Sequence, residues 1–546
     1  MSTRRPAYWG RTRVAVALLG VALIATGVFG AAGALPAQAV GTVHAPLVGS
    51  GSTWSANALQ AWIRNVWANY QWKITYSESG STQGRNDFAQ GTADFGVSEI
   101  PYGIANSQEA DARPSRGFAY MPIVAGGTAF MYNLEIGGRR VTNLRLSGDT
   151  IAKIFTGTIT TWDDAAIKAD NPALALPAIP IVPVVRSDGS GATAQVSIWL
   201  RQEHTQQWDA YCGKVGRPFV NDHCGVTSNY PVAPGSGFVS RSGSNGVAGY
   251  VAQSHAVGAI TFVEYSYALN SGFPVAKVLN SSGYYTEPTA QNVAVALLSA
   301  HINEDITSPD YLTQNLSDVY TSGDPRTYPL SSYSYIILPT QLESGFTENK
   351  GLTLADFGAY FLCEGQNDAE TLGYSPLPIN LVQAGQKQIE RIPGGNPVIK
   401  GTIDCNNPTF SPDGSNKLAN EAPYPADCDR QGATQCTAGT GGAKDTPTQA
   451  AGDDQAAAGA GTGSGTGTTA GGGTAGGDSS VVQADAVPVL VDATPQSIPV
   501  APVGILPSLA MLGAGGGMLA FAAVPPLLGK RSRRSLFPTP TRGSPR

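Results

Sequence analysis

The chain has 546 residues, a formal net charge of −6 and only 14% charged residues. Sparse charge of net negative sign excludes the basic face of a nucleic-acid-binding protein, so we expect no nucleic acid among the partners. The six cysteines form no C-x-x-C pair or Cys/His cluster, and we therefore expect no metal and no cofactor.

The first 39 residues have the pattern of a secretory signal peptide. A basic opening, MSTRRPAYWGRTR, precedes an uncharged apolar run, and Ala37-Gln38-Ala39 has the small-x-small spacing of a cleavage site. We predict export, with a mature chain that begins at Val40. The alternative is a signal anchor that is never cut. No cysteine lies near the cleavage point, so lipid attachment there is excluded.

Three strand–turn–helix junctions follow, and the first runs from Gly49 through GSGST into an amphipathic helix. Thr53 or Ser55 is a candidate cap for this helix. Taken alone, a capped helix explains this junction more simply than a ligand site does. The apolar positions of the helix recur at three- and four-residue steps and predict a face packed on a core; they are Leu59, Trp62, Ile63, Val66, Trp67 and Tyr70.

The second junction repeats this arrangement. A strand that ends near Ser77 leads through Gly80-Ser81-Thr82 into a second helix, and a strand over 93–97 then delivers Glu99 at its end. Open α/β folds bind ligands where strands end and helices begin. The alternative is that Glu99 is a solvated residue at a strand end with no role in binding.

The third junction, VVRSDGSGATAQ, has a strand at 184–185, a turn from Arg186 to Gly191 and a helix from Ala194 to Arg201. Helix N-termini favour anions, so three such junctions predict one anion site. Arg186 would supply its full positive charge, held in position by Asp188. The alternative is an exposed local ion pair, which contributes little to stability.

Enzymatic motifs are absent from the sequence. It contains no G-x-S-x-G, no G-x-x-x-x-G-K-[ST] and no H-E-x-x-H. The five histidines are scattered, and only Glu99 could be offered as a catalytic base. We therefore predict that the protein is not an enzyme and has no catalytic residue.

The cysteines of an exported chain favour disulfides, although their connectivity cannot be deduced from sequence. We predict nearest-neighbour pairs, Cys212–Cys224, Cys363–Cys405 and Cys428–Cys436.

The C-terminal part of the chain has the composition of a tether followed by a membrane anchor. Gly, Ala and Thr dominate 437–480, which predicts a flexible linker over 437–497. The apolar segment 503–528 is long enough to span a bilayer, and KRSRR follows it. The positive-inside rule places the tail, 529–546, in the cytoplasm and the body outside. We predict a single-pass protein of the cell membrane. The sequence contains no LPxTG motif, so covalent attachment to a cell wall is not indicated.

Several segments, in order, resemble one family, the extracytoplasmic phosphate-binding protein of the high-affinity phosphate ABC transporter. The resemblance is strong over 46–270, thins through 271–400, and does not cover the insertion near 204–245, the 405–440 region or the tail. The matching segments are GSGSTW, SGSTQG, ADFGVSEIPY, LSGDTIAKIFTGTITTWDDAAIKADNP, VVRSDGSGATA, GSNGVAGYVAQ and VGAITFVEYSYA.

This resemblance implies an α/β, two-lobed periplasmic-binding-protein-like fold of type II, whose hinge closes on a dehydrated phosphate. It places 40–127 in lobe 1, 128–265 in lobe 2 with a Cys-bearing insertion, and 266–436 in a return to lobe 1 plus a disulfide-containing extension. It also implies phosphate-binding residues in both lobes: Thr53, the Trp54 N–H, Ser81, Glu99, Arg186, Ser190 and Gly191, with Asp188 orienting Arg186.

The resemblance also implies a role for the acid: it would accept a hydrogen bond from a proton that phosphate carries and sulfate lacks, and so reject sulfate. Two positions depart from the family. Glu99 stands where the family has Asp, and Ala192 stands where it has Thr, although Thr193 is adjacent. A lost hydrogen bond to a charged ligand costs about 1.5–3 kcal/mol, or about ten- to a hundredfold in affinity.

Two functions follow from this resemblance. The first is a membrane-anchored monomer that captures inorganic phosphate outside the cell and delivers it to ABC permease subunits. The alternative is a surface protein on the same scaffold, with a weakened anion site, that serves in sensing, adhesion or cell-envelope interaction.

Overall fold

The computed structural model describes residues 43–109, 112–343, 345–395, 405 and 407–448. The predicted signal peptide, the predicted membrane helix at 503–528 and the linker beyond residue 448 lie outside them. Among the described residues, no helix is both long and apolar enough to cross a membrane.

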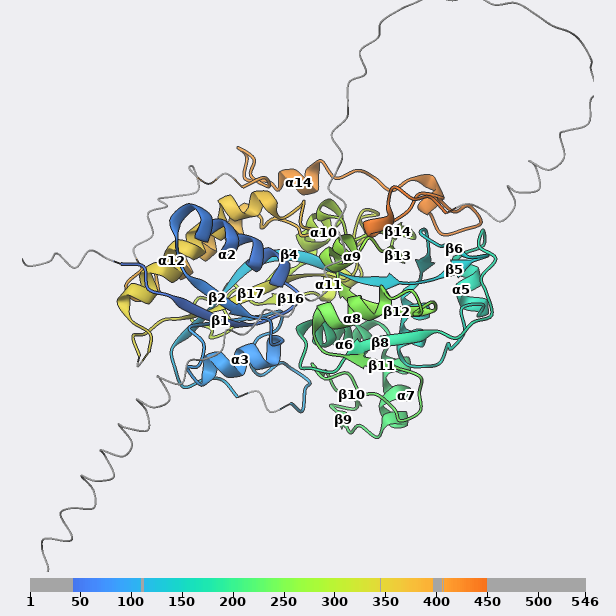
Figure 1. The fold of residues 1–546 in the computed structure, drawn as a ribbon, viewed down its shortest axis with the longest axis horizontal. Helices are drawn as coiled ribbons and strands as arrows, with labels where there is room; N and C mark the ends of the chain where they lie inside the picture. Colours follow the sequence, from blue (N-terminus) through green and yellow to red (C-terminus); the bar gives the residue numbers. More distant parts are fainter. Residues whose placement is uncertain (1–42, 110–111, 344, 396–404, 406, 449–546) are drawn as a thin grey trace, which may run out of the picture. The chain divides into compact units, whose positions relative to one another are not determined.

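One mixed sheet of eleven strands, counted over the described residues, connects two lobes. Its main path runs β11-β8-β12-β4-β17-β3-β1-β2, while β13 pairs with β4, β7 and β14. Figure 1 shows β1, β2 and β17 of lobe 1 on the left and β8, β11 and β12 of lobe 2 on the right. The strands of this sheet are β1 (Leu47–Gly51), β2 (Ile74–Ser77), β3 (Phe95–Ser98), β4 (Phe118–Tyr132), β7 (Arg145–Leu146), β8 (Val182–Arg186), β11 (Val239–Arg241), β12 (Ala259–Glu264), β13 (Val275–Leu279), β14 (Tyr285–Thr286) and β17 (Ser331–Pro339).

The long strand β4 belongs to both lobes. Its residues 118–127 pair with β17 of lobe 1, and its residues 128–132 pair with β12 of lobe 2. Its sequence is almost continuously apolar and buried, because helices cover both faces of the sheet. The pairing of β17 with β4 shifts register between Ser334 and Tyr335. The connection between the lobes therefore passes through paired strands.

Helices pack on both lobes. In lobe 1, α2, α3, α12 and α13 contact the sheet, and in lobe 2, α6, α8 and α9 do so. The α-helices are α2 (Ala56–Tyr70), α3 (Ser81–Ala89), α4 (Gly148–Phe155), α5 (Ala165–Asp170), α6 (Gly191–Glu203), α7 (Thr205–Val215), α8 (Gly243–Val251), α9 (Tyr265–Ser271), α10 (Ala290–Ala296), α11 (Ser317–Tyr320), α12 (Glu348–Leu362), α13 (Ile379–Ile389) and α14 (Lys417–Asn420). Short strand pairs β5–β6 (Glu135–Ile136, Arg139–Arg140), β9–β10 (Phe219–Val220, His223–Cys224) and β15–β16 (His301–Ile302, Gln314–Asn315) complete the described body.

The three predicted strand–turn–helix junctions are present in the structure as β1–α2, β2–α3 and β8–α6. Helix α6 begins at Gly191, three residues before the predicted start, because the Ser190 side chain accepts a hydrogen bond from the Thr193 N–H and caps it. In α2, Trp67 and Tyr70 are 45% and 46% exposed, so the prediction that they pack on the core is wrong. Tyr70 lies in the last turn and stacks instead on Trp72 at 4.6 Å.

All three predicted disulfides are confirmed: Cys212–Cys224, Cys363–Cys405 and Cys428–Cys436. Their sequence separations are 12, 42 and 8 residues. Each one ties a loop or an insertion to a nearby element.

The segment 437–448, predicted to be part of the flexible linker, packs on lobe 2. The Thr440 hydroxyl accepts from the Val275 N–H at 3.1 Å and donates to the Val275 carbonyl at 2.5 Å. The linker prediction is wrong for these twelve residues, because composition does not reveal that the start of β13 offers backbone groups for pairing. Strand β13 itself falls within 266–436, the predicted return to lobe 1. It pairs with the lobe-2 part of β4 and therefore lies in lobe 2.

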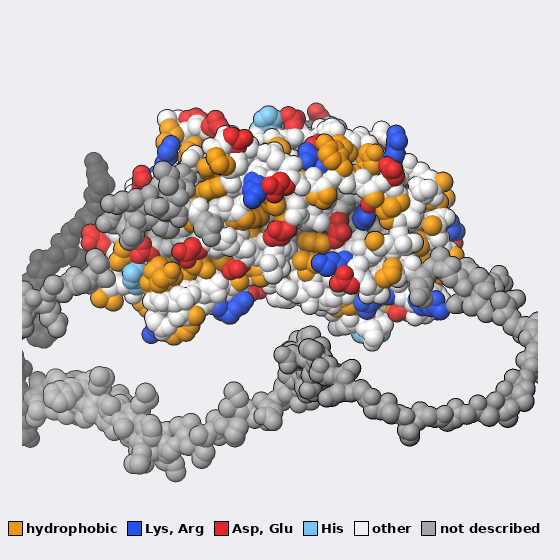
Figure 2. Space-filling model, turned by 90° about the horizontal axis from the view of Figure 1, so that it is seen from above, with side chains coloured by type: hydrophobic (Ala, Val, Ile, Leu, Met, Phe, Trp, Pro, Cys, Tyr) orange, Lys and Arg blue, Asp and Glu red, His pale blue; other side chains and the backbone are white. Residues whose placement is uncertain are grey.

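Acidic and basic side chains are interspersed on the face of the body seen in Figure 2. The large apolar side chains that are well exposed among the described residues include Leu298, Ile306 and Tyr424, which lie in separate segments. Single exposed apolar residues are normal on soluble domains. Because acidic and basic side chains are interspersed on the face seen in Figure 2, that face has no patch of a single charge sign that would steer a large charged partner.

Candidate functional site

The starts of α2, α3 and α6 meet where the two lobes touch. The Gly191 N–H of lobe 2 donates to the Ser81 hydroxyl of lobe 1 at 3.1 Å. The Ser244 N–H of lobe 2 donates to the Thr53 hydroxyl of lobe 1 at 3.2 Å. The structure thus brings together the three junctions that the sequence singles out. Helix N-termini and hydroxyls from both lobes converge on one place, an arrangement suited to an anion.

Arg186 supplies the positive charge of this place from the end of β8. Its side chain is 3% exposed, and it forms a two-pronged ion pair with Asp188, with the Nε–Oδ1 contact at 2.7 Å. Its Nη1 also donates to the Ser244 hydroxyl at 3.3 Å. The alternative of an exposed surface pair is therefore wrong, because a buried guanidinium requires charge-assisted partners.

Asp188 holds the arginine in place and is itself fixed by lobe 2. Its Oδ1 accepts a hydrogen bond from the Gly243 N–H at 2.9 Å. Burial acts to raise the pKa of Asp188, but the Arg186 guanidinium and the Gly243 N–H outweigh it and leave the pKa below its usual value. Asp188 therefore stays ionised at neutral pH and keeps the Arg186 guanidinium paired.

Glu99 is 1% exposed, so the alternative that it is a solvated residue at a strand end is wrong. Its Oε1 accepts hydrogen bonds from the hydroxyls of Ser52 and, at 2.9 Å, Ser334. Its Oε2 accepts from the Ser81 hydroxyl at 2.7 Å. Three hydroxyls thus hold the carboxylate in a fixed orientation. A Cβ atom added to Gly191 would lie 2.1 Å from Oε2, so the carboxylate touches lobe 2 directly.

The turn 52–54 is held by three buried tyrosine hydroxyls. Tyr76 donates to the carbonyl of residue 52 at 2.7 Å, and Tyr374 donates to that of residue 54 at 2.7 Å. Tyr267 of lobe 2 donates to the carbonyl of residue 53. Because these three carbonyls have donors, the turn is fixed between the lobes. The predicted ligand group at position 54, the Trp54 N–H, donates to the Ser52 hydroxyl at 2.9 Å.

The start of α6 contains Ala192, which stands where the family has threonine. Ser190 is 1% exposed and caps the helix, while Ala192 is 4% exposed and offers no donor from its side chain. The adjacent Thr193 hydroxyl is buried and has no hydrogen-bond partner among the described residues. A hydroxyl that could replace the missing threonine is thus present one residue later.

Sequence reasoning missed three hydroxyls of the site, those of Ser52, Ser244 and Ser334. Ser52 and Ser244 lie in the GSGSTW and GSNG segments, so a search for every hydroxyl in those segments would have found them. Ser334 lies in β17 at the register shift and has no local signal. Only the tertiary pairing of β17 with β3 and β4 brings it to Glu99.

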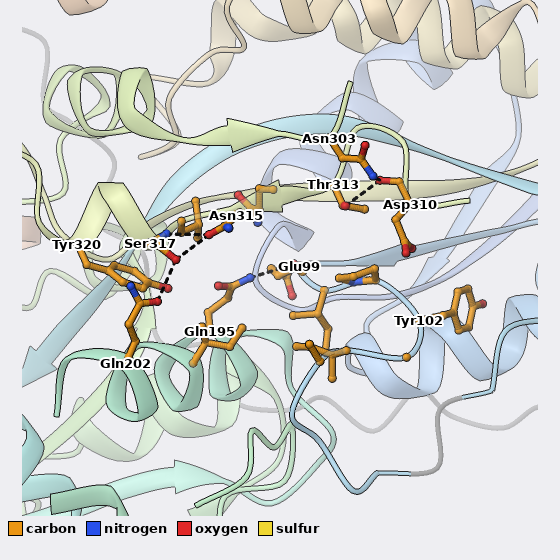
Figure 3. A pocket seen from close by; sticks show the side chains of 18 residues that line it. Glu99, Tyr102, Gln195, Gln202, Asn303, Asp310, Thr313, Asn315, Ser317 and Tyr320 are labelled. Carbon is orange, nitrogen blue, oxygen red and sulfur yellow. Dashed lines mark hydrogen bonds between the residues drawn. The ribbon is translucent and has the colours of Figure 1, made fainter. Parts of the chain in front are cut away.

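A cavity of about 400 Å³ lies beside Glu99, between the two lobes. Figure 3 shows side chains from the loop after β3, from α6 and from 303–320 around it. On α6, the Gln195 amide donates to the Glu99 backbone carbonyl at 2.8 Å and links the lobes at this edge. Of the predicted site residues, only Glu99 lines this cavity. The cavity therefore lies beside the predicted anion site and does not coincide with it.

Among the described residues, no group of three His, Cys, Asp or Glu side chains is placed to hold a metal ion. The site is built instead from one cation, two carboxylates, hydroxyls and backbone N–H groups. Such a set can bind a small oxyanion, and the Glu99 carboxylate would accept a proton that the anion carries.

The chain is similar to several known proteins. The family model of the PBP superfamily domain matches residues 36–364. The chain is 31% identical to the phosphate-binding protein PstS of Xylella fastidiosa over 355 residues, which cover 65% of this chain and 86% of that protein. It is 27% identical to PstS of Methanocaldococcus jannaschii over 350 residues, covering 63% and 85%. A solved structure of the ancestral soluble variant of the human phosphate binding protein is 19% identical and covers 65% of this chain and 100% of that chain, with a TM-score of 0.48.

Proposed function

Because this chain belongs to the PBP superfamily and, within it, to the PstS phosphate-binding proteins of phosphate ABC transporters, we propose that its two lobes capture inorganic phosphate for uptake. The family consists of binding proteins, so the chain is not an enzyme. Two contacts between the lobes carry the proposal. Buried Glu99 of lobe 1 faces Gly191 of lobe 2. Buried Arg186 donates to Ser244, whose N–H donates to Thr53 of lobe 1. The alternative surface role gains no support from these relatives.

In this proposal, each side of the phosphate has its own partners. Arg186 pairs with the anionic oxygens, and the N-termini of α2 and α6 supply N–H groups near Trp54 and Gly191. The hydroxyls of Thr53, Ser81 and Ser190 donate to the remaining oxygens. In the structure, several of these groups bond to one another, and they would exchange those bonds for bonds to the anion.

We assign the outer parts of the chain to anchoring. An exported body, a linker beyond residue 448 and an apolar segment at 503–528 would keep the phosphate site outside the cell and tethered to its membrane. A tethered body would remain close to the permease subunits that receive the phosphate. Protease treatment of intact cells tests this topology, because it should release the body and leave the tail protected.

Calorimetric titration of the full-length protein with phosphate and with sulfate tests the binding proposal. Phosphate should bind, and sulfate should bind at least tenfold more weakly at neutral pH, because only phosphate carries a proton for the Glu99 carboxylate. A protein that binds neither anion would overturn the proposal. Equal affinities would leave anion binding intact but remove Glu99 as the group that reads the proton.

A Glu99→Gln variant should raise the affinity for sulfate relative to phosphate. Its amide keeps the shape of the side chain but can present N–H₂ to an unprotonated oxygen, so the repulsion that rejects sulfate is removed. Competition titration of the two anions measures the ratio. Glu99→Asp is the matched control, because it keeps the charge and restores the family's shorter acid, and it should preserve the preference for phosphate.

A further inference from the structure

The Cys-bearing insertion of lobe 2 reaches across to lobe 1 and pairs with it. The Val226 N–H donates to the Asn106 carbonyl at 2.8 Å, and Ser107 forms a β-bridge with Val226. The Asn221 amide donates to the Asn106 side chain at 2.9 Å. Residues 106–109 and 219–229, here called the strap, therefore join the lobes through contacts outside the proposed phosphate ligands.

At the end of the strap, one carboxylate gathers the donors of a whole turn. Glu109 of lobe 1 accepts from the Thr227 hydroxyl at 2.5 Å, from the Ser228 N–H at 2.8 Å and from the Ser228 hydroxyl at 2.5 Å. The backbone and side-chain nitrogens of Asn229 add contacts at 3.3 and 3.2 Å. Thr227 and Ser228 are each 1% exposed, so water competes poorly for their bonds, whereas Asn229 is exposed.

Ser228 connects this clamp to the proposed phosphate site. Its carbonyl accepts from the N–H of Ser190, the residue that caps α6, at 2.9 Å. Its hydroxyl lies 2.9 Å from that of Thr82, the neighbour of Ser81 on lobe 1. Ser228 thus touches both turns that supply the proposed ligands. Any force that holds Ser228 against lobe 1 also holds the start of α6 there.

The charge of Glu109 strengthens the clamp. Burial acts to raise the pKa of Glu109, but the hydrogen bonds from residues 227–229 outweigh it and leave the pKa below its usual value. The carboxylate is therefore ionised at neutral pH, and hydrogen bonds to an ionised acceptor are about twice as strong as neutral ones. The insertion that carries the turn is itself fixed, because Cys212–Cys224 ties it to α7.

We propose that Glu109 is a positioning residue that closes the lobes through the strap and so slows the release of phosphate. This inference rests on the proposed function for its ligand. The strap contacts themselves are made between residues of the chain and involve no ligand. The strap would add to the closure that the anion itself favours. Closure contacts of this kind act mainly on the dissociation rate, because they must break before the ligand leaves.

The test compares Glu109→Ala, Glu109→Gln and the control Glu304→Ala in the full-length protein. Glu304 is an exposed carboxylate, so its removal controls for the change in net charge. Stopped-flow displacement measures the phosphate dissociation rate, and hydrogen exchange measures protection of the amides at 226–229. Glu109→Ala should raise the dissociation rate about tenfold or more and reduce this protection. Glu109→Gln should lie in between, since its amide oxygen still accepts from the turn.

The outcomes separate the strap from the phosphate proposal. Unchanged dissociation and unchanged protection in Glu109→Ala would overturn the role of Glu109. Lost protection in Glu109→Ala, in a chain that binds no phosphate, would support the strap and overturn the proposed function. An equal effect from Glu304→Ala would show a general charge effect and would also overturn the role of Glu109.

Discussion

Arg186→Ala is expected to weaken phosphate binding by about a hundred- to a few thousandfold. Removing one partner of a buried charge pair costs about 3–5 kcal/mol, and each 1.4 kcal/mol is tenfold in affinity. The loss is enlarged because Asp188 remains, buried with its hydrogen bond from Gly243 but without its cation. The variant would present two carboxylates, Asp188 and Glu99, to an incoming anion. Isothermal titration calorimetry with phosphate measures the change.

Two further variants make this result interpretable. Arg186→Lys keeps the charge but loses the two-pronged contact to Asp188, so it should bind phosphate with intermediate affinity. Arg64→Ala removes an exposed arginine from α2 and should bind as the wild type does. If Arg186→Ala bound phosphate as tightly as the wild type, the assignment of the site would be wrong.

Gly191→Ala is expected to abolish tight phosphate binding while leaving the fold intact. The added Cβ would lie 2.1 Å from the Glu99 Oε2 and 2.7 Å from the Ser81 hydroxyl oxygen, distances that real Cβ contacts do not reach. The lobes could therefore close only with Glu99 or Ser81 displaced. Alanine suits a helix better than glycine does, so the thermal stability of α6 should hold or rise. Calorimetry and thermal unfolding together distinguish blocked closure from misfolding.

A matched control and a rescue sharpen this test. Gly249→Ala makes the same change inside α8 at a position with open space around it, and it should bind phosphate normally. Adding Glu99→Asp to Gly191→Ala withdraws the clashing carboxylate by one methylene and should recover part of the affinity. Tight binding by Gly191→Ala alone would show that Glu99 and Gly191 do not face one another in solution.

The strand–turn–helix junctions could be predicted from the sequence because their signals are local. Glycine and hydroxyl residues ahead of an apolar period mark the starts of α2, α3 and α6, and Arg186 and Glu99 follow directly from strand ends. The role of Ser334 could not be predicted, because only the pairing of β17 with two strands far away in sequence brings it to Glu99. The strap was missed for the same reason, since Glu109 and Ser228 are 119 residues apart.

Composition failed at the C-terminal side of the body for a different physical reason. A Gly- and Thr-rich segment buries little apolar surface, so it is expected to stay flexible. Residues 437–448 are fixed nevertheless, because the Thr440 and Gly441 backbone and hydroxyl groups pair with the start of β13 and with Glu287. Hydrogen bonding to backbone groups already present on the body replaced the missing hydrophobic contact.

The tyrosine hydroxyls that hold the turn 52–54 set an alkaline limit for the protein. Burial, followed by nearby carboxylates, raises the pKa of Tyr76 and Tyr374 well above the usual 10.0 in the folded chain. Their contribution to stability is complete below a pH of about 10 and falls as the pH rises toward the folded-state pKa, because the unfolded chain releases these protons first. A tyrosinate could not donate to the carbonyls of 52 and 54. Titration with alkali should therefore show tyrosinate absorbance, loss of anion binding and unfolding in one transition.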